Sequence, residues 1–390
     1  MRLTRTKIAA LAAAVILAAC GGGEGAGDQN PRVAFSSLVS FGDSLSDVGT
    51  YRVGTVAAVG GGKFTVNGPN ARNWTEWIAS NIKVAAPCPA QTGLLPNIPG
   101  LVGAPVTNAP ACTNYAQGSA RVSNVFAPNS ASLQAAPFSQ VNIGLMALPV
   151  NQQLAAHLAK SNGKFSGTEL VTVMAGGNDA FMNINGVSAA AAGGTAAVGA
   201  AVAAGWPAAT QQAVAAGGAA AVNAAATAAV TTMGQAGAEL AGLVQAQVLA
   251  KGAKYVVVVN LPDVSQTPSA LLADVQTRGL INQMVTTFNA QLAAGLAGTP
   301  VVLVDAYSQG RDQTANPAQY SLTNVTTPAC STTSPANPFQ GSSLGCTSAS
   351  TVQADVSGFL YADSSGHPTP FGYQLLAQFV GVQMAKAGWL

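Results

Sequence analysis

The sequence predicts an α/β fold in which a parallel β-sheet carries helices on both faces. Segments with helical spacing of apolar residues separate several short apolar runs, and such alternation is typical of parallel sheets. The runs are rich in Val or Leu, as expected of strands that are covered on both faces. They are residues 36–41, 170–174, 255–260 and 301–305. The chain has 390 residues, of which 49% are hydrophobic, so it can bury a large core.

The helices are predicted from the spacing of apolar residues and from residues that favour a helix start. The predicted segments are 71–82, 150–161, 240–249, 271–296 and a last helix that begins at Pro370. Trp74, Trp77 and Ile78 lie on one face of the first segment. Pro149 precedes the second, where proline suits the first turn, and Thr369 is placed to cap the last.

The first twenty residues resemble a bacterial lipoprotein signal. A positively charged start is followed by an apolar run over 8–19, which is shorter than the roughly 20 residues that span a membrane. The run ends in Leu-Ala-Ala-Cys, so residues 1–19 would be removed and Cys20 would become the lipidated N-terminus. The alternative is an ordinary secretion signal that is cut near Ala19.

The residues after Cys20 suggest where the protein is held. Gly21 follows Cys20, and in the lipoprotein pattern the absence of Asp at this place implies the outer membrane. Residues 20–35 are rich in glycine and are predicted to be a flexible tether, with the folded domain over 36–390. We therefore expect a lipoprotein of the cell envelope, or otherwise a secreted protein. Only 8% of residues are charged and no basic cluster occurs, so a nucleic-acid partner is not expected.

Two segments, 84–140 and 306–357, interrupt the alternation and are predicted to be loops, with one short strand around Tyr115. Each segment contains two cysteines, and an even number in an exported chain suggests disulfides. Sequence separation favours the pairs Cys88–Cys112 and Cys330–Cys346, although three pairings are possible. A zinc site is not expected, because no CxxC pair and no nearby histidine is present.

Residues 180–250 are dominated by Ala and Gly, and Glu239 is the only charged residue among them. One interpretation is an insertion of core helices with low-complexity filler. The other is an apolar flap over a site for an apolar substrate. Repeated glycines and Trp206-Pro207 interrupt the segment too often for a membrane span.

The chain has two histidines, so a mechanism that needs a histidine base must use one of them. His157 lies in the middle of a predicted helix, where a surface or packing position is expected. His367 lies on a loop just before the last helix, four residues after Asp363. A serine nucleophile needs a base to take its proton, and the base needs a partner on its other nitrogen. Asp363 and His367 can supply both.

Two serines compete for the role of nucleophile. Ser343 lies in a GxSxG match, but neither a strand before it nor a helix after it is predicted, so we interpret the match as chance. Ser44 follows the first predicted strand, at the carboxyl end where open α/β sheets bind ligands. Its acidic neighbours Asp43 and Asp47 are expected to brace the turn through hydrogen bonds to the backbone.

Two further segments can donate hydrogen bonds to a developing oxyanion. Asn178 follows the second predicted strand, after Gly176-Gly177, and its side-chain amide is a donor. Gly118 lies in NYAQGSA, where a backbone N–H could point into the same cleft. Each segment taken alone is compatible with a plain turn, but together they favour acyl transfer.

The blocks FGDSLSDVG, NYAQGSA, GGND and HPTP together resemble the four blocks of the GDSL/SGNH hydrolases. The segments KFTVNGPNARNWTEWIA and VVVVNLPDVSQTPSA resemble further parts of that family, so the resemblance covers most of residues 36–386. It implies a flavodoxin-like α/β/α sandwich of three layers and ester hydrolysis. Carried over by position, Ser44 is the nucleophile and His367 the base, while the Ser44 amide, Gly118 and Asn178 form the oxyanion hole.

The sequence departs from the family pattern at two places. Gly118-Ser119 stands where the family usually has Gly-Gly, so the amide that points inward can differ. The family's acid usually lies three residues before the histidine, which here is Ser364, whereas Asp363 lies four before it. Asp363 remains the predicted acid, with Ser364 or a backbone carbonyl as the alternative.

The predicted function is a serine hydrolase that cleaves carboxylic esters through an acyl-enzyme on Ser44, with no metal and no organic cofactor. Lipid or acyl esters are the first expected substrates. An acyltransferase that uses the same site is the nearest alternative, and a non-enzymatic surface lipoprotein with a vestigial site is another. A carbohydrate deacetylase is less favoured, because few aromatic residues lie near the motifs.

Overall fold

The central sheet is parallel, and its strands lie in the order β1–β4–β5–β6. These are the four predicted strands, with ends that shift by two residues or fewer: β1 Leu38–Gly42, β4 Leu170–Met174, β5 Tyr255–Val259 and β6 Val302–Val304. The short strand predicted around Tyr115 is reduced to single-residue parallel bridges, in which Asn114 lies beside Ser40 of β1 and beside Pro89. The sheet thereby gains a partial fifth member at its β1 edge.

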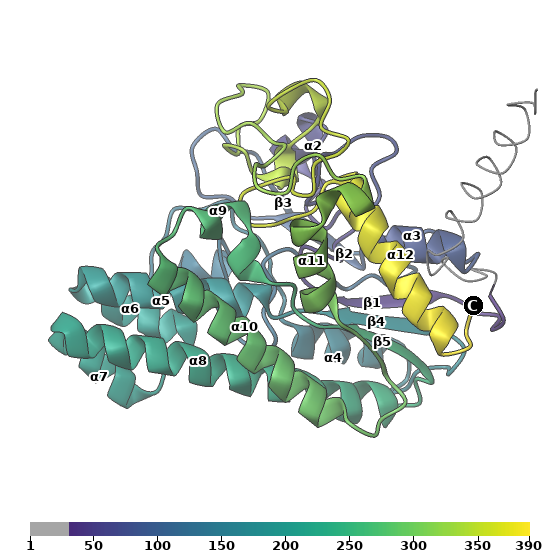
Figure 1. Ribbon diagram of the computed structural model, residues 1–390, viewed down its shortest axis with the longest axis horizontal. Helices are drawn as coiled ribbons and strands as arrows, with labels where there is room; N and C mark the ends of the chain where they lie inside the picture. The colour runs from purple at the N-terminus through teal and green to yellow at the C-terminus, as the bar shows by residue number, and fades with distance from the viewer. Residues whose placement is uncertain (1–30) are drawn as a thin grey trace, which may run out of the picture.

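Helices cover both faces of this sheet, so the chain forms the three-layer α/β/α sandwich that the sequence predicts (Figure 1). Successive strand residues point to opposite faces. Val39 and Val171 therefore belong to the core on one face, and Leu38 and Leu170 to the core on the other. The first face is covered by α4 (Val150–Lys160), α5 (Gly177–Ala192), α8 (Gly218–Leu243) and α10 (Val275–Leu296), and the second by α3 (Trp74–Asn81) and α12 (Pro370–Lys386).

Capping residues set the helix starts. Thr369 caps α12 as predicted, because its side chain accepts a hydrogen bond from Gly372 N. Asn73 and Glu76 form a capping box that starts α3 three residues later than predicted. Asp274 caps α10, so this helix begins at Val275 rather than at residue 271. The short α9 (Pro268–Leu271) precedes it.

The structure described here is a computed structural model, and it describes residues 31–390. The predicted signal over 1–19, Cys20 and the tether up to residue 30 lie outside the described residues. The last part of the predicted tether is folded. Arg32 N and Val33 N both donate hydrogen bonds to Trp389 O, and Phe35 packs edge-on against Tyr255. The domain therefore begins before residue 36.

The two predicted loop segments contain regular structure that the sequence analysis missed. Strands β2 (Gln91–Leu94) and β3 (Ala104–Asn108) form an antiparallel hairpin, and helix α11 (Ala306–Ala315) follows β6. A short α2 (Gly54–Ala58) lies near the hairpin in Figure 1. Both favoured disulfides are confirmed, Cys88–Cys112 and Cys330–Cys346. A disulfide bond therefore crosslinks each of the two loop segments.

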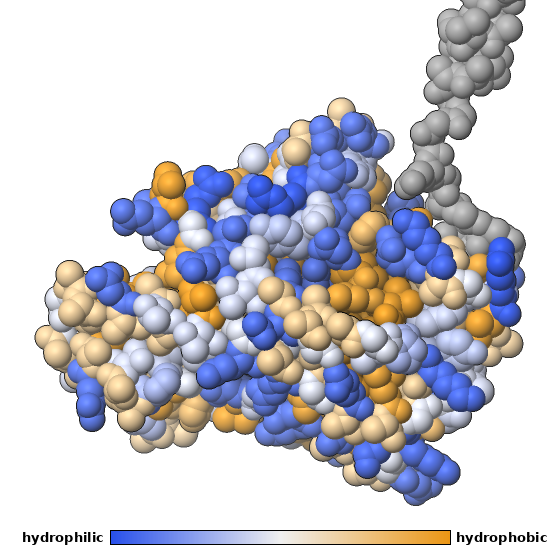
Figure 2. Space-filling model, turned by 60° about the horizontal axis from the view of Figure 1, so that its bottom comes forward, coloured by the Kyte–Doolittle hydropathy of each residue, from blue (hydrophilic) through white to orange (hydrophobic). Residues whose placement is uncertain are grey.

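The Ala/Gly-rich region 180–250 is helical almost throughout. It comprises most of α5, then α6 (Thr195–Ala204), α7 (Ala208–Ala216), α8 and a π-helical turn over Val244–Leu249. Its alanines contribute heavily to the main core, so the interpretation as core helices holds. The end of the molecule that these helices build is covered in Figure 2 mainly by pale, weakly hydrophobic residues. Among residues 31–390, no helix has the length and hydropathy of a membrane span.

Candidate active site

The end of strand β1 presents Ser44 at the carboxyl edge of the sheet. Gly42 has a φ of +148°, and a Cβ at this position would lie 2.0 Å from Met174 O of the neighbouring strand. Only glycine lets the two strands approach this closely. The side-chain amide of Gln153 clamps Gly42, donating to its carbonyl and accepting from its N–H, both at 2.8 Å. The chain then turns, and Ser44 follows within two residues.

Two buried carboxyl groups brace this turn, as the sequence predicts. Asp43 Oδ1 accepts a hydrogen bond from Leu45 N at 3.0 Å. Asp47 Oδ1 accepts from Gly49 N and Thr50 N, both at 2.8 Å. Burial outweighs these hydrogen bonds and raises the pKa of Asp43 to about 7 and that of Asp47 to about 6.

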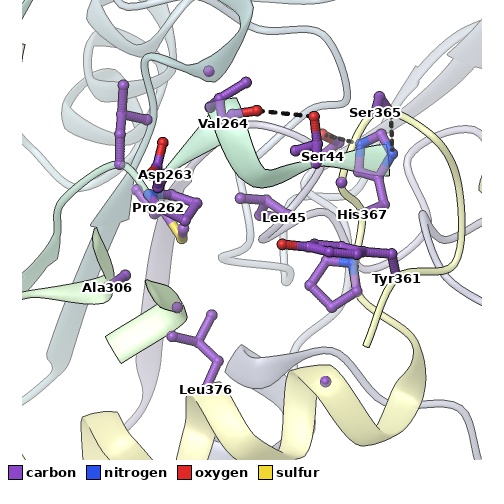
Figure 3. Close-up of a pocket in the computed structure, with 18 of the residues that line it drawn as sticks. Ser44, Leu45, Pro262, Asp263, Val264, Ala306, Tyr361, Ser365, His367 and Leu376 are labelled. Carbon is purple, nitrogen blue, oxygen red and sulfur yellow. Dashed lines mark hydrogen bonds between the residues drawn. The ribbon is translucent and has the colours of Figure 1, made fainter. Parts of the chain in front are cut away.

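Ser44, His367 and Asp363 form one hydrogen-bonded relay. Figure 3 shows the His367 end of it, with the imidazole between Ser44 and Ser365. His367 Nε2 lies 2.7 Å from Ser44 Oγ, and His367 Nδ1 lies 2.7 Å from Asp363 Oδ2. The hydroxyl of Ser365 donates to Asp363 Oδ1 at 2.6 Å and so holds the carboxylate in place. Ser364 is exposed and does not contact the imidazole. The structure thus places Asp363, despite its wider spacing, where the acid is needed.

The charges of this relay favour a carboxylate beside an imidazole that readily takes a proton. Burial alone would raise the pKa of Asp363, but the positive charge and hydrogen bond of His367 hold it well below its usual range. Burial alone would lower the pKa of His367, but the carboxylates of Asp363 and Asp43 outweigh it and raise this pKa. This is the arrangement a general base needs when it must receive a proton from a serine hydroxyl.

Ser343, the rival nucleophile, is fully buried. It begins a single 3₁₀ turn, so the strand–turn–helix context of a nucleophile elbow is missing, as expected. The segment is nevertheless not filler, because the backbone N–H of Ser343 donates to Asp363 Oδ2 at 3.0 Å. His157 is buried against the aromatic rings of Phe41 and Phe165, in the expected packing position, and burial lowers its pKa to about 4.

Asn178 lies beside Ser44 at the N-terminus of α5, where the helix dipole favours negative charge. Its Nδ2 donates one hydrogen bond to Ala120 O at 3.0 Å. The amide has two hydrogens, so the second remains for an oxyanion. If it serves this way, Asn178→Ala lowers kcat by about 10²–10³-fold with little change in KM. Steady-state kinetics on a soluble ester test this, and a loss confined to KM would instead assign Asn178 to substrate binding.

The predicted role of Gly118 needs correction. Its N–H donates to Asp47 Oδ2 at 2.9 Å, so it is not available to an oxyanion. The next residue, Ser119, has a φ of +67° and lines a cleft together with Ser44 and Asn178. Among residues 31–390, no acceptor for Ser119 N or for Ser44 N is found. The sequence thus departs from the family's Gly-Gly at Ser119, and the backbone N–H of Ser119 rather than that of Gly118 is available to an oxyanion.

Gly118 has a packing role that the sequence analysis missed. A Cβ at this position would lie 2.2 Å from the ring of Phe64. Phe64 in turn packs on the imidazole of His367, with ring centroids 5.0 Å apart. Glycine at 118 therefore lets the aromatic ring support the base.

A buried ion pair fixes the two donor segments to each other. Arg121 Nε lies 2.9 Å from Asp179 Oδ1, and both side chains are only 5% exposed. The same guanidinium donates to Ala203 O and Ala204 O at the end of α6. Through these hydrogen bonds, the Ala/Gly-rich region holds Arg121 and thereby the loop that follows Gly118. Neither residue was singled out from the sequence, because nothing in the local pattern pairs positions 121 and 179.

An apolar pocket of about 120 Å³ opens beside Ser44 (Figure 3). Its walls come from the end of β1, the segment after β5, α11 and the C-terminal helix, and they include Leu45, Pro262, Val264, Ala306, Tyr361 and Leu376. Within the described part of the chain, Phe181 is the only residue of the 180–250 region that lines this pocket. The flap interpretation of that region is therefore not supported, and the apolar walls come from segments predicted as strand ends, loops and the last helix.

Comparison with known proteins agrees with this geometry. A family model described as GDSL-like lipase/acylhydrolase matches residues 38–380. The match extends over all four segments that contribute to the site. Among curated proteins, no match to the sequence is found.

Proposed function

The chain belongs to the GDSL-like lipase/acylhydrolase family, and on this premise we propose that it hydrolyses carboxylic esters through an acyl-enzyme on Ser44. The family makes it a serine esterase, lipase or acyltransferase. The observation that carries the choice of chemistry is the relay from Ser44 through His367 to Asp363, with hydrogen bonds of 2.7 Å on both sides of the imidazole. A site that had lost its activity would not need the nucleophile, the base and the acid to stay in hydrogen-bond contact.

The proposed reaction has two halves. Ser44 Oγ attacks the carbonyl carbon, and its proton passes to His367 Nε2. The C–O bond to the alcohol then breaks, and the alcohol leaves with that proton. A water molecule next gives a proton to His367 and its oxygen to the acyl carbon. The bond between that carbon and Ser44 Oγ then breaks, and His367 returns the proton to Oγ, which releases the acid and restores Ser44. The amides of Ser44 and Ser119 and the side chain of Asn178 supply hydrogen bonds to the oxyanion.

The apolar pocket supports an ester with a linear acyl chain. Its surface is mainly apolar, although carboxyl, amide and hydroxyl groups and the catalytic imidazole also line it. Burial of each CH₂ of an acyl chain contributes about 0.8 kcal/mol. Two acids line this wall: Asp263 is held by Arg311 Nη1 at 2.6 Å, and Asp43 braces the turn at Ser44. The pocket therefore suits a hydrocarbon chain better than a charged group. Water is the proposed acceptor, because no observation favours a dedicated acceptor in its place.

A series of p-nitrophenyl esters from acetate to palmitate tests this function, and Gly310→Phe locates the acyl chain. Gly310 of α11 lines the pocket, and a Cβ there would meet no atom within 4 Å. A Cβ at this position therefore has room, and we expect the added ring to occupy part of the pocket. We expect kcat/KM on octanoate to fall at least about tenfold relative to acetate, which corresponds to about 1.4 kcal/mol.

Gly279→Phe is the matched control, because Gly279 is an exposed helical glycine with open space around it and lies outside the pocket. Its ratio of octanoate to acetate activity should equal that of the wild type. Equal losses on both esters in Gly310→Phe would place the acyl chain elsewhere.

We also propose that Cys20 carries lipid and holds the enzyme at the membrane of the cell envelope. The support is the Leu-Ala-Ala-Cys sequence that ends the apolar run over 8–19. Cys20→Ala should move the protein from the membrane fraction to the soluble fraction after export, with unchanged kcat on soluble esters. A wild-type protein that is already soluble after export would favour simple secretion.

A further inference from the structure

A second cavity, of about 400 Å³, also opens at the catalytic residues. It shares Ser44, His367, Asn178, Phe181 and Ser365 with the apolar pocket, whereas its other walls are different. The catalytic pair therefore lies between a narrow cavity and a wider one. An ester bound at Ser44 has two arms, so the wider cavity is the place for the arm that the apolar pocket does not hold.

The walls of the wider cavity, named here the polar cleft, combine aliphatic and aromatic side chains with neutral hydrogen-bonding groups. Asn129, Asn185, Thr332 and Gln340 line it, and all four are exposed. Within residues 31–390, none of these side chains makes a hydrogen bond to another part of the chain. They are thus available to a ligand that both donates and accepts hydrogen bonds.

The polar cleft has no Arg or Lys among its lining residues, and its one imidazole, His367, is the catalytic base. Its one acid, Asp363, is buried and engaged with His367. A phosphate-bearing alcohol would need Arg or Lys to balance its charge, and a cationic alcohol would need a free carboxylate. The cleft offers neither. Its chemistry fits an uncharged alcohol.

Aromatic rings complete the cleft. Phe339 is half-buried at its rim, and Phe64 lies near the imidazole. Amide and hydroxyl groups interspersed with aromatic faces suit a molecule that has apolar C–H faces and a ring of hydroxyls. The Cys330–Cys346 disulfide closes the loop that presents Thr332, Phe339 and Gln340. This rim is therefore preorganised for binding.

We propose that the substrates are acyl esters of neutral, hydroxyl-rich alcohols, namely sugars or polyols, with the acyl chain in the apolar pocket and the alcohol in the polar cleft. The inference rests on the proposed ester hydrolysis at Ser44 and names its substrate class. It reverses the sequence-based argument against sugar substrates, because the fold brings Phe64 and Phe339 from distant segments to Phe181, which closely follows the GGND motif.

Three hexanoate esters test the proposal: 6-O-hexanoylglucose, cyclohexylmethyl hexanoate and hexanoylglycerol 3-phosphate. The acyl chain is the same in all three, and the first two alcohols have six-membered rings with and without hydroxyls. We expect kcat/KM for the glucose ester to exceed the other two by at least about tenfold, as several neutral hydrogen bonds can supply. A preference for the cyclohexylmethyl or the phosphate ester, or no preference, would overturn the proposal.

Variants then localise the effect. Gln340→Leu and Asn129→Leu should each lower the ratio of glucose-ester to p-nitrophenyl hexanoate activity by about two- to tenfold, the range for one neutral hydrogen bond. Gln319→Leu is the control, because Gln319 is an exposed glutamine in the same loop region and lies outside both cavities. Its ratio should equal the wild-type ratio. An unchanged ratio in both cleft variants would place the alcohol elsewhere.

The wild-type enzyme separates the two levels of inference. If the wild-type protein does not hydrolyse p-nitrophenyl hexanoate, the proposal that it is an ester hydrolase is wrong. Hydrolysis of that ester without preference for the glucose ester would remove only the assignment of the alcohol.

Discussion

Ser44→Ala leaves a folded protein whose kcat on p-nitrophenyl esters is lower by about 10⁴–10⁶-fold, the range for loss of a catalytic serine. The expectation follows from the relay, in which Ser44 Oγ is the atom that His367 Nε2 contacts at 2.7 Å. Removal of Oγ leaves no atom to form the acyl-enzyme. Folding should be preserved, because no other hydrogen bond of the described residues depends on that hydroxyl. Circular dichroism and steady-state kinetics provide the measurements.

Ser343→Ala is the control for this prediction. Ser343 is buried, its side-chain oxygen has no hydrogen-bond partner, and it reaches Asp363 through its backbone N–H. Alanine keeps that N–H, so the variant should retain most of the activity. An organophosphonate should label the peptide that contains Ser44. Labelling of Ser343 would overturn the assignment of the nucleophile.

Asp363→Asn gives the second large effect, a loss in kcat of up to about 10⁴-fold with the fold intact. Asp363 Oδ2 accepts a hydrogen bond from His367 Nδ1, which leaves Nε2 free to accept the serine proton. An asparagine amide can instead donate to Nδ1, which favours the tautomer that carries its proton on Nε2. The base then points a proton at Ser44 rather than a lone pair.

The pH profile gives an independent readout of the same contact. His367 works as a base only when it is neutral, so activity is lost as the pH falls below its pKa. The Asp363 and Asp43 carboxylates raise this pKa, so the acidic limb of the wild-type profile lies above the usual histidine value of about 6.5. Without the Asp363 charge, the residual activity of the Asn variant should have its acidic limb at lower pH.

Ser364→Ala is the comparison, because Ser364 occupies the family's usual position for the acid. It is exposed and makes no contact with the imidazole, so a loss of about tenfold or less is expected. A large loss in this variant, beside a near-normal Asp363→Asn, would replace Asp363 as the orienting group.

The strands and two of the key side chains could be predicted from the sequence because their signals are local. A buried parallel strand is a short apolar run, and Ser44 and Asn178 follow such runs directly. His367 was identified by elimination among two histidines and by its place before a helix start. The four-residue spacing of Asp363 did not exclude it, because a flexible loop can absorb one residue.

The remaining features depend on contacts between distant segments. Whether Gly118 or Ser119 faces the cleft is decided by Asp47, which lies 71 positions away from Gly118 and takes its N–H. The acyl pocket needs α11, whose polar sequence between Ala306 and Ala315 lacks a clear amphipathic pattern. The 180–250 region could be assigned as helical core only from its packing, since alanine repeats carry no directional signal.

The Cys330–Cys346 bridge has a consequence for when the enzyme becomes competent. It closes a loop with a sequence separation of 16, and that loop brings Ser343 N–H to the acid. At its other end, Cys330 N donates to Ala362 O, next to Asp363. In a chain whose cysteines are reduced, closing such a loop costs about 3 kcal/mol of entropy, so the acid loses part of its support. Formation of this disulfide and assembly of the relay are therefore coupled, and a chain with reduced cysteines should have lower activity than the oxidised one.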